Sequence, residues 1–76
     1  MLTLSELRKG EKAIITEFAI EEIPLKLIEM GCLPGNTVEL VQHAPFKDPL
    51  YININGSFLA IRKETASKII INKASE

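Results

Sequence analysis

The sequence has 76 residues, of which 46% are hydrophobic, and nine Lys and Arg against ten Asp and Glu leave a formal net charge of −1. This length predicts one domain, residues 1–76, with enough apolar residues to form a core. A net charge near zero argues against a nucleic-acid-binding domain, because such domains usually carry a clear excess of basic residues. The single cysteine excludes an internal disulfide, and no signal peptide or apolar run of about 18 residues is visible, so we expect a cytoplasmic protein.

The first regular element predicted along the chain is a strand over residues 11–18, "EKAIITEF". Its β-branched and aromatic residues are typical of strands. Because side chains alternate along a strand, Ala13 and Ile15 share one face, and Ile14 lies on the other.

A short helix of about two turns is predicted next, in "EEIPLKLIEMG". Pro24 suits the first helical position, where its missing N–H is not needed. Ile23, Leu27 and Met30 form an apolar stripe along one side. Gly31 stands where a helix commonly ends in a left-handed residue, a conformation that glycine adopts at little cost.

The hexapeptide "GCLPGN" after this helix contains the only cysteine, Cys32. Pro34-Gly35 suits the two central positions of a type II turn, so the glycines of this stretch have backbone roles. A catalytic thiol needs a base within hydrogen-bond reach. The only histidine, His43, lies eleven residues further on, beyond a predicted turn and strand. The sequence therefore favours Cys32 as a small core side chain over a reactive thiol.

The clearest pattern in the chain is a β-hairpin in "LYININGSFLAIR". Asn55-Gly56 between two alternating apolar runs is typical of a two-residue type I′ turn, which sets the register of the two strands. In that register Ile54 faces Ser57, Ile52 faces Leu59 and Leu50 faces Ile61 on the inner face, while Tyr51 opposes Ala60 and Asn53 opposes Phe58 on the outer face.

Two further strands complete the prediction, one in "NTVELVQHA" and a closing one in "IIIN", and "KETASK" between them forms at most one helical turn. The expected fold class is mainly β, with about five antiparallel strands and one short helix inserted after the first strand. A sheet in so small a chain is best hidden by curling it into a barrel, which removes exposed edges.

The sequence offers little for catalysis or metal binding. A structural zinc site needs four Cys or His ligands, and the chain has only Cys32 and His43. No Gly-x-Ser-x-Gly elbow and no glycine-rich phosphate loop is present. We therefore predict no enzyme activity, no catalytic residues, no cofactor and no dedicated metal site. A weak transition-metal site shared between two copies is left as an alternative.

Partner binding at an exposed surface is the function that remains. The hairpin register places Tyr51 and Phe58 outward, the turn after the helix presents Leu33, and the proline-bracketed loop "PFKDP" presents Phe46 and Lys47. Exposed aromatic and large apolar side chains are candidate anchors for a partner. We predict that these side chains line a groove between the helix and the hairpin; the alternative is that the helix covers the outer face of the hairpin.

The succession of these motifs resembles the ferrous iron transport protein A (FeoA) family over nearly the whole chain. "LSELRKGEKAIITEF" is similar to the family's Leu-x-x-Leu-x-x-Gly opening and first strand, and "KLIEMGCLPGNTVELV" to its Leu-x-x-Leu/Met-Gly-hydrophobic-x-Pro-Gly motif. "APFKDPLYININGSFLAIRKETASKIII" is similar to its Ala-Pro-x-x-Asp-Pro loop, hairpin and ending. Two positions depart from the pattern. Lys47 replaces a glycine that is usual before the loop aspartate, and Lys26 replaces an arginine often found in the helix, which would weaken a bidentate contact.

The resemblance implies an SH3-like barrel, a cytoplasmic location and an accessory role in bacterial ferrous iron uptake. The implied partner is FeoB, a membrane iron transporter with a cytoplasmic GTP-binding domain. The resemblance implies no catalytic residues and no tight metal site, and it leaves room for weak transition-metal binding and weak association between copies. The alternative function is a small-barrel nucleic-acid-binding or regulatory module, because a related barrel forms the C-terminal domain of iron-dependent repressors; a nucleic-acid binder would show strongly salt-dependent affinity.

Overall fold

The computed structural model describes residues 2–73, apart from the side chains of Ile20 and Lys47. Within this range no helix is long and apolar enough to cross a membrane. The strands are β1 (Leu2–Thr3), β2 (Lys12–Glu17), β3 (Thr37–His43), β4 (Leu50–Ile54), β5 (Ser57–Ile61) and β6 (Ile70–Lys73). They are connected by two short α-helices, α1 (Leu25–Glu29) and α2 (Lys63–Ala66), and by three 3-10 segments, η1 (Leu4–Glu6), η2 (Ile20–Glu22) and η3 (Pro45–Lys47).

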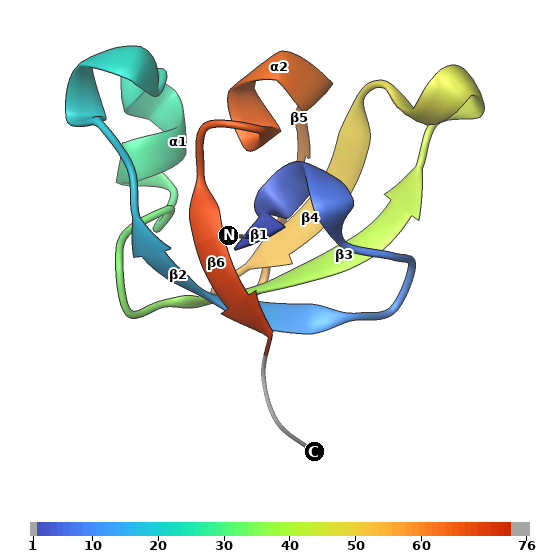
Figure 1. The fold of residues 1–76 in the computed structure, drawn as a ribbon, viewed down its shortest axis with the longest axis horizontal. Coiled ribbons are helices and arrows are strands. Elements are labelled where there is room, and N and C mark those ends of the chain that lie inside the picture. Colours follow the sequence, from blue (N-terminus) through green and yellow to red (C-terminus); the bar gives the residue numbers. More distant parts are fainter. Residues whose placement is uncertain (1, 74–76) are drawn as a thin grey trace.

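All six strands belong to one antiparallel sheet in the order β1-β6-β2-β3-β4-β5, and this sheet curls around its own inner face (Figure 1). The pairing register shifts at Thr16 in β2 and at Val41 in β3, where one strand has an extra residue relative to its partner. Such an extra residue bends its strand and increases the local twist. Both register shifts therefore help the sheet to curl. The Thr16 Oγ1 hydroxyl donates to the carbonyl oxygen of Ile70 at 3.0 Å. The result is a barrel in which the two edge strands, β1 and β5, do not pair with each other.

The expected mainly β barrel is confirmed, with a correction to the strand count. The predicted number of about five is one short, because β1 consists of Leu2 and Thr3 alone. Two residues are too few to show a period-2 pattern. The predicted first strand is thus β2, and α1 follows it as expected. The helical turn expected in "KETASK" is α2.

The hairpin has the predicted register. Asn55 and Gly56 have φ angles of 54° and 83°, as a type I′ turn requires. The facing pairs are Leu50–Ile61, Tyr51–Ala60, Ile52–Leu59, Asn53–Phe58 and Ile54–Ser57.

The helix α1 is shorter than predicted and begins one residue later, because Pro24 is its N-cap and not its first helical residue. Its apolar stripe faces the core as expected, with Ile23 and Leu27 buried. Gly31 follows the helix with a φ of 105°, and the Asn36 Nδ2 amide donates to the Gly31 carbonyl oxygen at 2.7 Å. The side chain of Asn36 therefore fixes the end of the helix to the turn that follows it.

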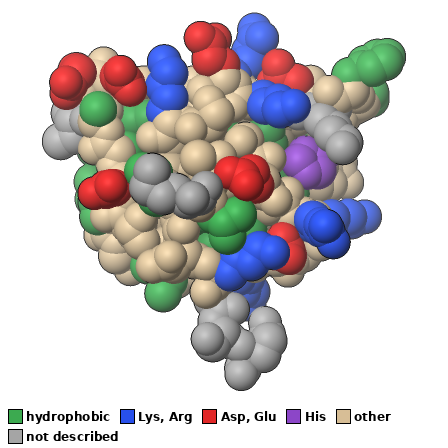
Figure 2. All heavy atoms as spheres, in the orientation of Figure 1, with side chains coloured by type: hydrophobic (Ala, Val, Ile, Leu, Met, Phe, Trp, Pro, Cys, Tyr) green, Lys and Arg blue, Asp and Glu red, His purple; other side chains and the backbone are tan. Residues whose placement is uncertain are grey.

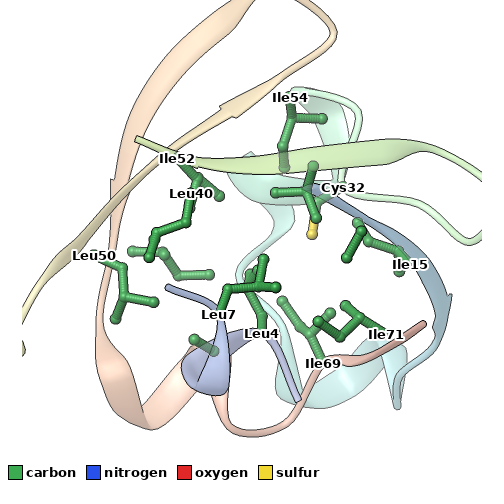
Figure 3. Packing of buried hydrophobic residues seen from close by; sticks show 14 of the residues in the cluster. Leu4, Leu7, Ile15, Cys32, Leu40, Leu50, Ile52, Ile54, Ile69 and Ile71 are labelled. Carbon is green, nitrogen blue, oxygen red and sulfur yellow. The ribbon is translucent and has the colours of Figure 1, made fainter. Parts of the chain in front are cut away.

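The core is formed by hydrophobic side chains from every strand except β1, together with residues of α1, α2, η1 and the loops (Figure 3). No polar or charged residue is buried among the residues that the structure describes. The predicted inner face of the hairpin is confirmed for β4, because Leu50, Ile52 and Ile54 are fully buried. In β2 the buried face is the one that carries Ala13 and Ile15. The largest fully buried side chains are Leu4, Leu7, Ile15, Leu40, Leu50, Ile52, Ile54, Ile69, Ile71, Val38 and Cys32.

Candidate functional site

Cys32 lies in the core and not at the surface. Its side chain is fully buried, and Figure 3 shows its sulfur among apolar side chains. Burial raises the pKa of this thiol from 9.0 to about 11, because a low-dielectric environment disfavours the charged thiolate. The thiolate is the nucleophile and the metal ligand, so at neutral pH this side chain is inert. The structure supports the packing interpretation of Cys32.

We expect Cys32→Ala to lower the free energy of unfolding by about 0.5–1.5 kcal/mol, the usual cost of deleting one buried heavy atom, and to leave partner binding unchanged. The thiol ionises near 9.0 in the unfolded chain but near 11 in the folded one, so its contribution to stability is complete below pH 9 and is lost as the pH rises through 11. The variant has no thiol, so its free energy of unfolding should not show this decrease at alkaline pH. Urea titrations of both proteins at pH 7 and pH 10 measure the difference, and rapid reaction of the native thiol with a disulfide reagent at pH 7 would contradict the assignment.

The ring of His43 contacts the backbone. Its Nε2 lies 3.2 Å from the carbonyl oxygen of Leu7, and its Nδ1 has no hydrogen-bond partner among the described residues. Between residues 2 and 73, no three His, Cys, Asp or Glu side chains lie close enough together to hold a metal ion. A weak site shared between two copies stays a prediction.

Asp48 has a structural role that the sequence analysis missed. Its Oδ1 accepts a hydrogen bond from the backbone N–H of Lys63 at 3.0 Å. A carboxylate at this position satisfies one of the free N–H groups at the start of α2 and favours the helix dipole. This bond ties the proline-bracketed loop to α2. No local pattern indicates it, because the two residues are fifteen positions apart.

The five predicted partner-binding residues lie in three places. Tyr51 and Phe58 are on the outer face of the hairpin, 39% and 71% exposed. Leu33 is 40% exposed in the turn after α1, and Phe46 is 99% exposed in η3, where its φ of 66° is unusual for a bulky residue. The side chain of Lys47 lies outside the described part of the structure, so its role stays a prediction.

These residues do not form one surface. Gly31 lies against Asn55, at the turn of the hairpin, which places Leu33 near that end. Phe46 lies in η3, just before β4, at the opposite end of the hairpin. A strand of five residues separates the two ends by roughly 17 Å. Among the four predicted residues whose side chains are described, only Tyr51 and Phe58, diagonal neighbours on the paired strands, form a contiguous pair.

A groove of about 320 Å³ separates α1 from β5 and α2. A groove between helix and hairpin was predicted, but the residues that line it differ from those predicted. Because α1 lies beside β5 and not over the outer face, Phe58 stays exposed and the inner-face residues of β5 reach the groove. Basic side chains are the only charged ones in its lining, which consists of Pro24, Lys26, Leu27, Met30, Leu59, Ala60, Ile61, Arg62 and Thr65.

Basic side chains do not gather into a patch on the face shown in Figure 2, where Lys and Arg are interspersed with Asp and Glu. Nucleic-acid-binding domains present clustered Lys and Arg to the phosphate backbone. The face in view therefore does not favour the alternative of nucleic-acid binding.

A family model and a curated relative agree on one family for this chain. The model of the FeoA domain matches residues 2–73. A curated relative, the Fe(2+) transport protein A/Fe(2+) transporter FeoB fusion protein of Porphyromonas gingivalis, is 36% identical over 75 residues, which are 97% of this chain and 9% of the fusion protein.

Solved structures agree with the match. The structure of the FeoA protein from Chlorobium tepidum has a TM-score of 0.89 and 29% sequence identity, and the alignment covers 97% of this chain and 71% of that one. FeoA from Stenotrophomonas maltophilia, described as an SH3 domain protein and solved in complex with zinc, has a TM-score of 0.79 and 26% identity over 95% of this chain and 91% of that one.

Proposed function

The chain belongs to the FeoA family, whose model matches residues 2–73, and from this premise we propose that it is an accessory protein of ferrous iron uptake that binds and modulates the transporter FeoB. The observation that carries the proposal is the fusion protein of P. gingivalis, which by its name joins Fe(2+) transport protein A to FeoB in one chain. A covalent link holds two domains at high effective concentration, so that even a weak contact between them forms. We propose that the same contact forms between this chain and a separate FeoB protein.

The surface of the SH3-like barrel supports an adaptor role. Large apolar side chains are exposed outside the barrel, among them Leu33, Phe46 and Phe58. A few anchors of this kind supply most of the energy of a protein–protein interface. We propose the cytoplasmic GTP-binding domain of FeoB as the partner domain, with the protein acting in the cytoplasm.

Alanine substitutions at Leu33 and Phe46 test the predicted anchors. If these side chains are hot spots, each substitution should weaken binding to the GTP-binding domain of FeoB by about 1–3 kcal/mol, a rise in Kd of roughly 5- to 150-fold. Charge reversal at Lys47 should mainly change the association rate and its salt dependence. Calorimetric titration of folded variants measures the affinities, and GTP hydrolysis with and without the protein measures the modulation.

Ile14→Ala is the matched control, because Ile14 is also apolar and 41% exposed but lies on β2, away from the hairpin. Unchanged affinity after substitution of Leu33, Phe46, Tyr51 and Phe58 would place the interface elsewhere on the barrel. Absence of binding by the unmodified protein would contradict the proposed function. Binding to RNA or DNA with a steep salt dependence would instead favour the regulatory alternative.

A further inference from the structure

The strand β5 has one side that the described residues leave unpaired, since it pairs with β4 alone. The two-residue turn makes Ile54 and Ser57 a hydrogen-bonded pair, and such pairs alternate along an antiparallel ladder. The backbone N–H and C=O of Leu59 therefore face β4. Those of Phe58 and Ala60 point to the open side, where a further strand could bind them.

The strand β5 itself lacks the features that normally prevent strand pairing. Proteins protect exposed edges with very short strands, with charged residues or proline, with bulges, or with a covering helix or loop. The neighbouring helix α1 leaves a groove between itself and β5. The other edge strand, β1, is only two residues long. The sequence of β5, Ser-Phe-Leu-Ala-Ile, contains no charge and no proline, and its ladder with β4 has no register shift. An unprotected, apolar edge of this kind is suited to accept a strand.

The groove runs along the same open edge. Leu59, Ala60 and Ile61 line it from the side of β5, and Leu27 and Met30 line it from the side of α1. Its volume of about 320 Å³ is at the lower end of the range for ligand pockets, ~300–1,000 Å³. It therefore suits a short extended segment, whose inward side chains would contact the apolar lining.

The charges of the groove indicate which segment would fit. Lys26 and Arg62, both exposed, are the charged residues of the lining, and both are basic. Arg62 directly follows β5 and Lys26 lies in α1, so the two basic groups line the groove from opposite sides. A strand added beside β5 would place its apolar side chains against Leu27, Leu59 and Ile61. Acidic side chains of the same segment would complement the two basic groups of the lining.

We propose that the open edge of β5 accepts an extended segment of a partner protein, with alternating apolar and acidic residues, as an additional strand of the sheet. The assignment of that segment to FeoB rests on the proposed function. The mode of binding does not, because it follows from the edge, the groove and the two basic side chains.

Hydrogen exchange on the full chain tests strand addition directly. The probe is a capped eight-residue peptide of alternating valine and glutamate, with a valine–lysine peptide as its matched control. The acidic peptide should slow exchange of the amides of Phe58 and Ala60, which face the open side, by about tenfold or more at saturation. The amide of Leu59, already bonded to β4, should change less. The lysine peptide should have no effect.

Substitutions separate the edge from the charges. Ala60→Pro removes an N–H that points away from β4, a position where edge strands tolerate proline, so the barrel should fold and peptide binding should weaken about tenfold, the upper range for one hydrogen bond. Ala60→Val keeps the N–H and should bind as before. Lys26→Glu with Arg62→Glu should abolish the preference for the acidic peptide, whereas Lys12→Glu on β2 should not. These charge variants and the exchange experiment test the proposal even if Ala60→Pro fails to fold.

The same variants titrated with the GTP-binding domain of FeoB distinguish the two proposals. Binding of that domain without protection of Phe58 and Ala60 and without loss in the variants would overturn strand addition and leave the proposed function intact. Binding of the acidic peptide at this edge without binding of the domain would support strand addition and contradict the proposed partner. Failure of the acidic peptide to bind would overturn strand addition, as would a dimer of the chain that Ala60→Pro dissociates, because the edge would then bind a second copy.

Discussion

Ile52→Ala is expected to lower the free energy of unfolding by about 2–5 kcal/mol, the range for truncating a large side chain in a packed core. Ile52 lies in the middle of β4, opposite Leu40 of β3 and Leu59 of β5, and is fully buried. Truncation removes apolar contacts and leaves a cavity that the surrounding barrel closes only in part. A domain of 76 residues has a total stability of roughly 4–11 kcal/mol. The variant should therefore lose a large part of it.

Phe58→Ala is the matched control for this prediction. It deletes a larger side chain from the same hairpin, but one that is 71% exposed, so the expected loss is below about 1 kcal/mol. Urea titrations of the two variants and the unmodified protein measure both losses with one method. A loss for Ile52→Ala no greater than that for Phe58→Ala would contradict the assignment of the inner and outer faces of the hairpin.

The hairpin could be predicted from the sequence because every determinant is local. The Asn55-Gly56 turn selects the turn type, the turn type sets the register, and the register decides which side chains face inward. The end of α1 at Gly31 is likewise determined by a glycine and the turn after it. In both places the observed φ angles are those that the sequence motifs require.

Features that depend on distant residues could not be predicted in this way. The strand β1 exists because Leu2 and Thr3 pair with Ile71 and Ile70, and no pattern in two residues indicates this. The bond from Lys63 to Asp48 joins a loop to a helix fifteen residues away. Both are consequences of the curled sheet and not of local preference.

The candidate site also combines features set by the local sequence with features set by distant residues. The outward direction of Tyr51 and Phe58 follows from the hairpin register and could be predicted. The place of α1 beside β5 depends on packing between segments that are distant in the sequence. A groove between the helix and the hairpin was predicted, but its wall is formed by Leu59, Ala60 and Ile61 of β5 and not by Tyr51 and Phe58.

Gly31→Ala is expected to be strongly destabilising, for two separate reasons. Its φ of 105° is a conformation that residues with a side chain rarely adopt, and holding alanine there costs about 1–3 kcal/mol. A Cβ at this position would also overlap the Asn55 side-chain amide and lie 3.3 Å from Ile54 Cγ2. Asn55 is exposed and its amide is the free end of its side chain, so moving it aside adds less than the ~1–3 kcal/mol that overpacking of a core costs. Chemical denaturation measures the combined loss.

Two further variants separate the cost of the strained backbone at Gly31 from the cost of the contact between the new Cβ and Asn55. Gly56→Ala also places alanine at a positive φ, 83°, but with no atom within 4 Å of the new Cβ, so it should cost only the strain, about 1–2 kcal/mol. Asn55→Gly removes the side chain that Gly31 faces and suits the φ of 54° at that position, so the double variant Gly31→Ala/Asn55→Gly should recover part of the loss. A coupling energy of about 0.5–3 kcal/mol between the two sites would show that the new Cβ meets the Asn55 side chain, and therefore that the end of α1 lies against the hairpin turn. Additive losses with no coupling would contradict this placement.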